Sequence, residues 1–334
     1  MNHAVILAGG QGKRMHAPIP KPMFPVLGEP MLEWVLGACE GAGLTQICVV
    51  TGYEADQIKR YLNGRCETVY QEQRLGTGHA VMQAMPFLRR NAEGNTLVLC
   101  GDAPFIDSDT IRRSLDRHIF EHNAVTVITA RVDQPAGYGR ILRTDSGIAG
   151  IVEEKDATDE QKQITEINSG CYWFRTADLT EMLGQITDNN AQKEYYLTDT
   201  IAIALQSGLR AGAYCSRNPD VVLGANDRAG LLRLNTAARM AVLRSHMANG
   251  VGFVCTDGII IERSVTIGAG TEILPGTILR GKTVIGENCV IGPNCLLTDT
   301  TVGDRAVLNT VQAESARIDA DAKLGPFVHI PSGS

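Results

Sequence analysis

Residues 7–25 read LAGGQGKRMHAPIPKPMFP and directly follow a short apolar run, Ala4–Ala8. A buried strand that leads into a glycine-rich turn can line a concavity with backbone N–H groups, which bind anions. The three glycines permit backbone conformations and close approaches that a side chain would forbid, and Arg14 and Lys21 contribute two positive charges. The stretch predicts a polyphosphate site at the end of a first strand; a plain tight βα turn is the alternative interpretation.

The spacing of this turn differs from both common phosphate-binding motifs. A P-loop has four residues between its glycines before Lys-Ser/Thr, and the dinucleotide-binding fingerprint has a third glycine where Met15 stands. The stretch instead resembles the signature loop of the sugar nucleotidyltransferases. The resemblance implies that a nucleoside triphosphate is held by Leu7, Gly9, Gly10, Arg14 and Lys21.

Length and composition indicate a globular protein of two domains. The chain has 334 residues, of which 44% are hydrophobic and 20% charged, and its net charge is −6. A mildly acidic chain without a basic run is a poor candidate for binding nucleic acid, and no stretch reaches the length of a transmembrane helix. Nine cysteines without a CxxC pair indicate reduced thiols rather than disulfides or zinc. The N-terminal apolar run predicts a strand rather than a signal peptide, so we expect a cytoplasmic protein.

Residues 1–226 alternate short apolar runs with helical patterns. Strands are expected at 47–50, 68–70, 96–100 and 124–129, and helices at 31–42 and 111–122. Such alternation predicts an α/β, Rossmann-like domain with a mainly parallel sheet, helices on both faces and ligands at the carboxyl ends of the strands. Apolar residues at helical spacing, stopped by Gly250, predict a linker helix at 227–250.

Beyond the linker helix the hydrophobic period changes to six. Seven aliphatic residues recur six apart from 261 to 297, and a small or β-branched residue stands two places before each. This period predicts a left-handed parallel β-helix over 251–334, in which each aliphatic residue points inward from one side of a triangular coil. The register slips near Val302 and returns at Ile318. Cys289 and Cys295 occupy the small positions and are expected in the core.

Two further stretches offer side chains for nucleotidyl transfer, which brings two mutually repelling phosphates together and usually needs a divalent metal. QEQRLGTGHA (71–80) places Gln71 shortly before a Gly-Thr-Gly turn, and an amide can pair with a pyrimidine edge; an exposed loop is the alternative. GDAPFI (101–106) places Asp102 at the end of a predicted strand, where a carboxylate suits Mg²⁺. A helix N-cap is the alternative for Asp102, although Asp107 is better placed for that role.

Five more polar clusters follow in order: GYGRI (137–141), IVEEKDAT (151–158), EINSG (166–170), NNAQKEYYLTD (189–199) and GAND (224–227). Together with the six-residue repeat they closely resemble the bacterial bifunctional N-acetylglucosamine-1-phosphate uridyltransferase/glucosamine-1-phosphate acetyltransferase family, over essentially the whole chain. The resemblance implies in-line attack of N-acetylglucosamine 1-phosphate on UTP, which gives pyrophosphate and UDP-N-acetylglucosamine, a precursor of peptidoglycan and lipopolysaccharide. Grouped by what they contact in the family, the matching residues are Arg14 and Lys21 for the phosphates; Gln71, Gly76 and Thr77 for uracil; Asp102 and Asn226 for Mg²⁺; and Gly139, Glu153, Asn168, Glu194 and Tyr196 for N-acetylglucosamine.

Two features depart from this family. The segment 21–31, KPMFPVLGEPM, is nearer in places to hexose-1-phosphate thymidylyl- and uridylyltransferases, so another hexose-1-phosphate nucleotidyltransferase is an alternative. A non-catalytic regulatory homologue is a second alternative, against which the intact phosphate and metal residues argue. The family's acetyltransferase residues lie beyond the last coil of this chain, so we expect no acetylation of glucosamine 1-phosphate. The family's β-helices pack about a threefold axis, which implies a homotrimer.

Overall fold

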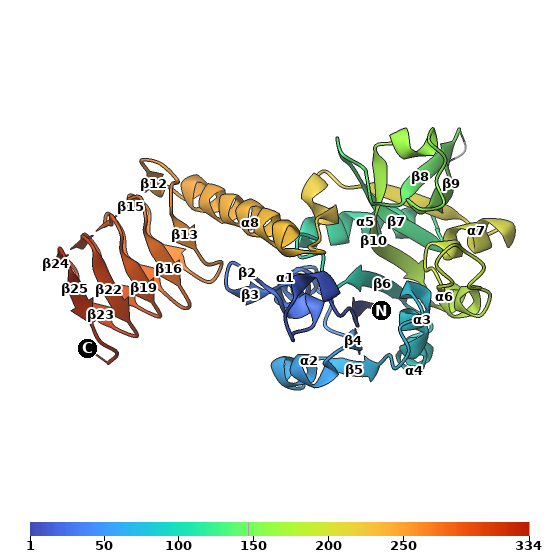
Figure 1. The fold of residues 1–334 in the computed structure, drawn as a ribbon, viewed down its shortest axis with the longest axis horizontal. Helices are drawn as coiled ribbons and strands as arrows, with labels where there is room; N and C mark the ends of the chain where they lie inside the picture. Colours follow the sequence, from blue (N-terminus) through green and yellow to red (C-terminus); the bar gives the residue numbers. More distant parts are fainter. Residues whose placement is uncertain (146, 334) are drawn as a thin grey trace. The chain divides into compact units, whose positions relative to one another are not determined.

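The computed structural model describes residues 1–145 and 147–333. Contacts divide the chain into two compact units: unit 1 comprises Met1–Phe24 and Glu29–Gly230, and unit 2 comprises Pro25–Gly28 and Leu231–Ser334. Figure 1 shows the helices and strands of both units. Among the described residues, no helix has the length and the apolar character needed to cross a membrane.

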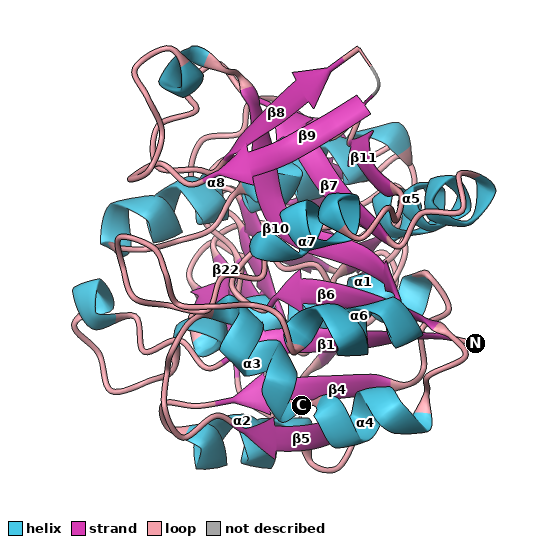
Figure 2. Cartoon of the chain, turned by 90° about the vertical axis from the view of Figure 1, so that its right-hand side faces the viewer, coloured by secondary structure: helices cyan, strands magenta, loops and turns pink. Residues whose placement is uncertain are grey.

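Unit 1 is built on a mixed sheet in which the first strand lies in the interior, with a neighbour on each side. β1 (Asn2–Ala8) pairs in parallel with β4 (Ile47–Thr51) and β6 (Asn95–Cys100), and β5 (Glu67–Tyr70) pairs in parallel with β4. On the other side of β6 lies β10 (Glu166–Arg175), which is antiparallel to both of its neighbours. β7 (Val125–Arg131) and β11 (Ala211–Cys215) complete the order β11-β7-β10-β6-β1-β4-β5, which can be followed in Figure 2. The predicted α/β fold class is confirmed, whereas the sequence patterns did not predict the antiparallel β10.

Helices cover both faces of this sheet, because apolar residues along each strand alternate between two cores. One core joins Ile6 and Val49 to α1, α2 and α5, and the other joins Val5 and Val50 to α3, α4, α6 and α7. The helices span Met31–Gly41 (α1), Ala55–Leu62 (α2), Thr77–Gln83 (α3), Met85–Arg90 (α4), Ser108–Phe120 (α5), Thr176–Leu183 (α6) and Asp199–Gln206 (α7). Asp107 caps α5 as predicted, since its Oδ1 accepts a hydrogen bond of 2.7 Å from the backbone N of Thr110.

Shorter elements connect these layers. A hairpin of β8 (Arg140–Thr144) and β9 (Gly147–Val152) joins the sheet where Arg140 pairs with Ile167 of β10. The remaining short elements are the 3₁₀ helices η1 (Lys13–Met15), η2 (Lys21–Met23), η3 (Gln161–Gln163) and η4 (Pro219–Val222), and the short strands β2 (Pro25–Val26) and β3 (Glu29–Pro30).

After the long helix α8 (Arg228–Ala248), unit 2 forms a parallel β-helix. Every third strand pairs in parallel, which gives three sheets in the orders β12-β15-β18-β21-β24, β13-β16-β19-β22-β25 and β14-β17-β20-β23. Six of the seven repeat positions are at most 2% exposed, Ile267 is partly buried, and Cys289 and Cys295 lie in the same core. These sheets and the matching burial confirm the predicted β-helix. Its strands span Gly252–Phe253 (β12), Ile260–Ile261 (β13), Thr266–Ile267 (β14), Glu272–Ile273 (β15), Ile278–Arg280 (β16), Val284–Ile285 (β17), Val290–Ile291 (β18), Leu296–Thr298 (β19), Thr301–Val302 (β20), Val307–Leu308 (β21), Val311–Glu314 (β22), Arg317–Ile318 (β23), Lys323–Leu324 (β24) and Val328–Ile330 (β25).

The slip in the repeat near Val302 comes from shortened corners. Core residues advance by five positions instead of six in three steps, 297–302, 308–313 and 313–318, and all of these core residues are buried. Each shortened step contains a residue in the left-handed region: Asp299 (φ 48°), Thr310 (φ 51°) and Ser315 (φ 47°). Sheet pairing continues across them, for example from Ile285 to Val302 and on to Ile318. The period therefore changes at corners while the apolar column remains continuous.

Candidate active site

The glycine-rich turn after β1 lies against two other segments of unit 1. A Cβ on Gly9 would stand 3.0 Å from Oε1 of Gln71, and one on Gly52 would stand 2.8 Å from the Cα of Gly9. The backbone N of Lys21 donates a hydrogen bond of 3.0 Å to the carbonyl of Gly10, so the chain folds back beneath the turn. Close backbone approach explains why glycines stand here.

The carboxyl ends of the parallel strands meet at this turn, as expected for this sheet type. The N–H of Gly101, just after β6, donates to the carbonyl of Leu7 at 2.9 Å. The N–H of Gln71, just after β5, donates to the carbonyl of Thr51 at 2.8 Å. A cavity of about 330 Å³ lies at these ends and is lined by Leu7, Gly9, Gly10, Lys21, Pro22, Gln71, Arg74, Gly76, Thr77, Ala80, Cys100, Asp102 and Glu194.

Lys21 holds the two predicted metal ligands together. Its Nζ forms an ion pair with Oδ2 of Asp102 and donates a hydrogen bond of 2.7 Å to Oδ1 of Asn226. An ammonium group between a carboxylate and an amide oxygen stands where a cation would be held, and such oxygens suit Mg²⁺. Among the described residues, no group of three or more His, Cys, Asp or Glu side chains is arranged to hold a metal ion. The donor set thus fits a cation that takes its remaining ligands from water and phosphate, as Mg²⁺ commonly does.

The amide of Gln71 presents its oxygen rather than its nitrogen. The side chain is 5% exposed, and Nε2 lies 3.3 Å from the carbonyl of Gly76, to which it donates, and 3.1 Å from Nδ1 of His79. Oε1 accepts no hydrogen bond from the residues that the structure describes. Because uracil carries an N–H between two carbonyls, the free oxygen is the atom that can accept from that N–H.

The turn at Gly76 and Thr77 packs closely against the segment 194–197. A Cβ on Gly76, whose φ is 106°, would stand 2.6 Å from the carbonyl oxygen of Tyr195. The hydroxyl of Thr77 accepts a hydrogen bond of 3.0 Å from the N–H of Leu197, and Tyr195 N donates to the carbonyl of Leu75 at 2.7 Å. This packing brings Glu194 to the wall of the cavity, beside the turn predicted to contact uracil.

A second group of predicted residues meets at the β8–β9 hairpin and β10. The N–H of Asn168 donates to the carbonyl of Gly139 at 2.9 Å, and a Cβ on Gly139 would stand 3.4 Å from both carboxylate oxygens of Glu153. Burial raises the pKa of the Glu153 carboxyl, and the charges of Asp156 and Asp199 add to the effect despite an opposing hydrogen bond from Thr198. Gly139, Glu153 and Asn168 therefore form one compact cluster, as the family resemblance implied.

Two predicted residues lie apart from these groups. Tyr196 is 9% exposed, and its hydroxyl accepts a hydrogen bond of 2.6 Å from Nε2 of Gln192. Arg14 is exposed on η1 and does not line the cavity. Arg74 does line it, although the sequence interpretation did not include this residue, which stands between Gln71 and the Gly-Thr-Gly turn.

The cavity floor contains a thiol that cannot act as a nucleophile. Burial raises the pKa of Cys100 well above its ordinary value, and the Asp102 carboxylate adds to the effect. Burial likewise raises the pKa of neighbouring Cys171 to about 11. Since the thiolate is the reactive form, these cysteines remain inert near neutral pH. All nine cysteines of the chain are free thiols in this structure.

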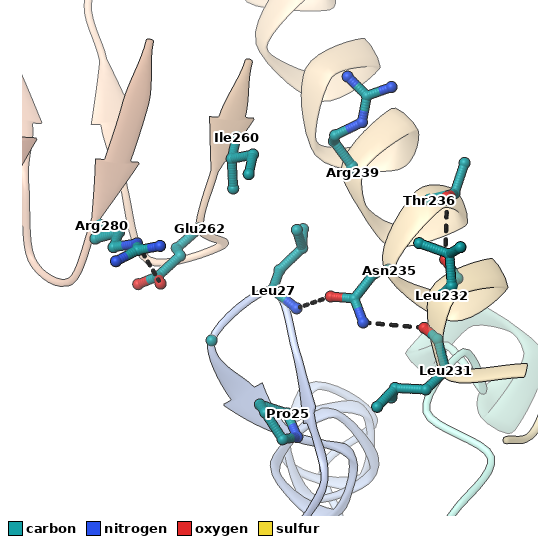
Figure 3. A pocket seen from close by; sticks show the side chains of 11 residues that line it. Pro25, Leu27, Leu231, Leu232, Asn235, Thr236, Arg239, Ile260, Glu262 and Arg280 are labelled. Atoms are coloured by element: carbon teal, nitrogen blue, oxygen red, sulfur yellow. Dashed lines mark hydrogen bonds and ion pairs between the residues drawn. The ribbon is translucent and has the colours of Figure 1, made fainter. Parts of the chain in front are cut away.

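A larger cavity, of about 750 Å³, lies within unit 2 and has a different character (Figure 3). Its walls are mainly apolar, with Pro25, Leu27 and Ile260 among the lining residues. Asn235 of α8 accepts a hydrogen bond of 3.0 Å from the backbone N of Leu27, and Arg280 pairs with Glu262. Since these polar groups already have partners, the cavity offers no evident reacting group.

Comparison with protein families gives two matches. Residues 3–221 match the model described as nucleotidyl transferase, and residues 264–299 match the model of the bacterial transferase hexapeptide, with six repeats.

Curated relatives align with nearly the whole chain. The chain is 43% identical over 333 residues to the bifunctional protein GlmU of Acetivibrio thermocellus, in an alignment that covers 99% of this chain and 72% of the relative. It is 39% identical over 334 residues to the bifunctional protein GlmU of Streptococcus gordonii, covering 100% of this chain and 72% of the relative. Among solved structures, a Bacillus anthracis protein described as a glucose-1-phosphate thymidylyltransferase aligns with a TM-score of 0.59 at 20% identity, covering 72% of this chain and 96% of that one. That similarity supports the fold alone.

Proposed function

Because the chain belongs to the bifunctional GlmU family of nucleotidyltransferases, we propose that it transfers UMP from UTP to N-acetylglucosamine 1-phosphate and releases pyrophosphate. The observation that carries the proposal is Lys21, which stands between Asp102 and Asn226 at the floor of a cavity lined by the glycine-rich turn. The cavity combines exposed backbone, a positive charge and a cation-binding pair of oxygens. These are the requirements of phosphoryl-group chemistry.

The reaction needs positioning and charge neutralisation rather than a protein nucleophile. An ionised oxygen of the sugar phosphate attacks the α-phosphorus of UTP; the new P–O bond forms as the bond from that phosphorus to the bridging oxygen breaks, and pyrophosphate leaves. The nucleophile is already ionised, so no general base is required. Backbone groups at Gly9 and Gly10 and the ammonium of Lys21 bind the phosphate oxygens and hold attacking and leaving oxygens in line. Arg14, from the neighbouring η1, adds a second positive charge.

Asp102 and Asn226 would hold Mg²⁺, which when bound neutralises phosphate charge. Uracil would be read by the free Oε1 of Gln71 and by the Gly76–Thr77 turn. The cluster of Gly139, Glu153 and Asn168 would bind the sugar, and the family resemblance adds Glu194 and Tyr196 as further sugar contacts. Support for the N-acetyl sugar comes from the presence of these residue types in the predicted order.

The test is a panel of four nucleoside triphosphates against several sugar 1-phosphates, read out as pyrophosphate release. UTP with N-acetylglucosamine 1-phosphate should be the fastest pair. Faster turnover of glucose 1-phosphate or dTTP would favour the hexose-1-phosphate alternative that the segment 21–31 suggests. Activity should vanish with EDTA and return with Mg²⁺; activity that survives chelation would reject the metal assignment.

The β-helix carries two further parts of the proposal. We expect a homotrimer packed through this unit, so light scattering should give three times the chain mass of 36.0 kDa; a monomer mass at micromolar concentration would reject it. We also propose that these 334 residues do not acetylate glucosamine 1-phosphate. Acetyl transfer needs a base within hydrogen-bond reach of the sugar amine, and His329, the histidine of residues 251–334, is exposed on the last strand, β25. Thiol release from acetyl-CoA that depends on glucosamine 1-phosphate would contradict this.

The proposed reaction takes place in the cytoplasm as part of cell-wall precursor synthesis, and we expect no role in nucleic-acid or membrane binding. Nine free thiols support a reducing compartment.

A further inference from the structure

His79, in the first turn of α3, contacts the side chain of Gln71 from outside the cavity. Its Nδ1 lies 3.1 Å from Nε2 of Gln71, yet His79 is not one of the residues that line the cavity. On the other side of the same amide, Oε1 lies 3.0 Å from the position that a Cβ on Gly9 would take. The amide nitrogen of Gln71 is therefore turned towards His79, and the amide oxygen towards the glycine-rich turn.

The carbonyl of Gly76 decides which way round the Gln71 amide stands. A carbonyl oxygen can only accept, and this one lies 3.3 Å from Nε2 of Gln71, so the amide nitrogen must face it. Both hydrogens of that nitrogen then have a partner, one in the carbonyl of Gly76 and one in Nδ1 of His79. A ring nitrogen that accepts a hydrogen bond carries no proton, so the neutral ring of His79 has its proton on Nε2.

The opposite ring nitrogen of His79 has a competing neighbour. Nε2 of His79 lies 3.3 Å from Nε2 of Gln83, which also donates a hydrogen bond of 3.1 Å to the carbonyl of His79. A neutral ring cannot accept at both nitrogens, so only one of the two amides can donate to it. Gln83 is only partly buried and can turn its amide oxygen towards the ring N–H, whereas the Gln71 amide is buried and is also held by Gly76. The contact with Gln71 is therefore the one that fixes the tautomer.

The orientation of the Gln71 amide determines which base the cavity can bind. With its oxygen free, Gln71 accepts a hydrogen bond from the ring N–H of uracil. Cytosine has a bare nitrogen at the same ring position, and two acceptors that face each other both lose their hydrogen bonds, which disfavours binding. An inverted amide would present an N–H and would reverse this preference.

We propose that His79 is a positioning residue that sets base selectivity: by accepting at Nδ1, it keeps the Gln71 amide oxygen towards the cavity and so favours uracil over cytosine. This inference rests on the proposed function. Because His79 does not line the cavity, it acts through Gln71 and does not touch the nucleotide.

The test compares two substitutions in the full chain: His79→Leu removes the acceptor, and His79→Asn supplies an amide oxygen near the place of Nδ1. In His79→Leu the KM for UTP should rise about tenfold, as expected for one lost hydrogen bond, while the KM for the sugar phosphate stays unchanged. The ratio of kcat/KM for UTP to kcat/KM for CTP should fall by a similar factor. His79→Asn should restore most of both values, which a purely structural role of the ring would not allow.

Two controls separate the contact with Gln71 from the other contacts of the ring. Gln83→Met removes the amide at the opposite ring nitrogen and should leave the KM for UTP and the UTP/CTP ratio unchanged. In a Gln71→Ala background, His79→Leu should have little further effect, because the two residues act as one unit.

An unchanged KM for UTP in His79→Leu would overturn the inference, and so would equal losses in His79→Leu and His79→Asn. A shift in Gln83→Met as large as that in His79→Leu would also overturn it. A wild-type chain that transfers no UMP from UTP would instead overturn the proposed function.

Discussion

At the scale of single residues, the ammonium group of Lys21 is the counter-ion of the Asp102 carboxylate in the ligand-free site. Its ammonium contacts both Asp102 and Asn226, which would repel or misplace each other without a cation between them. The same ammonium is proposed to bind phosphate during turnover, so it must leave these oxygens when a metal and nucleotide enter together. Free divalent metal must compete with a positive charge that is already in place.

Replacing Lys21 should therefore separate metal binding from catalysis. In Lys21→Met the affinity for free Mn²⁺, measured by EPR without nucleotide, should rise at least about tenfold, because a like charge within contact distance is removed. The kcat should fall on the order of 10² to 10³, the usual effect of losing one charged donor in a transition-state site.

Lys13→Met serves as the matched control, because Lys13 lies on η1 outside the cavity lining. It should alter neither Mn²⁺ affinity nor kcat strongly. Unchanged Mn²⁺ affinity in Lys21→Met would show that the ammonium does not compete with metal.

The sequence predicted the roles of side chains best where a side chain and its partner lie close together along the chain. Asp107 was expected to cap a helix, and it does so three residues from the backbone N–H that it binds. The partnership of Lys21 with Asn226 joins residues 205 positions apart and cannot be read from spacing.

At the scale of elements, the β5–α3 turn shows how one glycine joins two distant segments. Gly76 has a φ of 106°, and the backbone of Tyr195 occupies the space where a Cβ would stand. The turn can therefore lie against the segment 194–197 only if residue 76 has no side chain. Both segments border the cavity proposed to bind UTP.

Gly76→Ala should lower the free energy of unfolding by more than backbone strain alone would. We expect a loss of stability greater than the roughly 1 kcal/mol of a strained turn residue, and an increase of tenfold or more in the KM for UTP. Urea unfolding and steady-state kinetics measure the two effects.

Gly64→Ala provides the comparison, since Gly64 has a φ of 80° but nothing within 4 Å of its Cβ position. Strain without collision should lower stability by about 1 kcal/mol and leave the KM for UTP unchanged. Equal effects of the two substitutions would contradict the role of the Tyr195 contact.

Elements were predicted to within a few residues where their hydrophobic period is regular. The strands β1, β4, β5, β6 and β7 lie where apolar runs were found. The sequence did not predict β10 as a strand, because the glycine and polar residues of EINSG interrupt its first half. Its antiparallel direction depends on neighbouring strands that are remote in sequence. Antiparallel pairing is a tertiary choice that local patterns do not encode.

At the scale of the whole molecule, the change of period after residue 250 was enough to predict two different architectures. Contacts also group Pro25–Gly28 with the residues after Leu231, and no feature of the sequence marks that grouping.

The stability of the molecule should depend on pH through two buried histidines. Burial lowers the pKa of His3 and of His118 to about 4, and both side chains bond to buried threonine hydroxyls. The unfolded chain binds these protons near pH 6.5 and the folded chain does not, so their contribution to stability is lost as pH falls from about 6.5 towards 4. Thermal melts between pH 7 and 5 should show a falling melting temperature.

His118→Gln should reduce this dependence on pH, whereas His122→Gln, at an exposed position, should preserve it. An identical slope in wild type and His118→Gln would mean that His118 titrates normally in the folded protein.

The shortened coils of the β-helix bear on how such proteins change over evolutionary time. A residue missing inside a strand would turn its inward residues outward, whereas the residue missing from the steps that contain Asp299, Thr310 and Ser315 leaves the next core residue pointing inward. We therefore expect single-residue gaps among related chains to fall at corners rather than inside strands. Homologous chains aligned on a fixed six-residue spacing would drift out of phase here, and gaps placed at the corners should bring the inward positions back into correspondence.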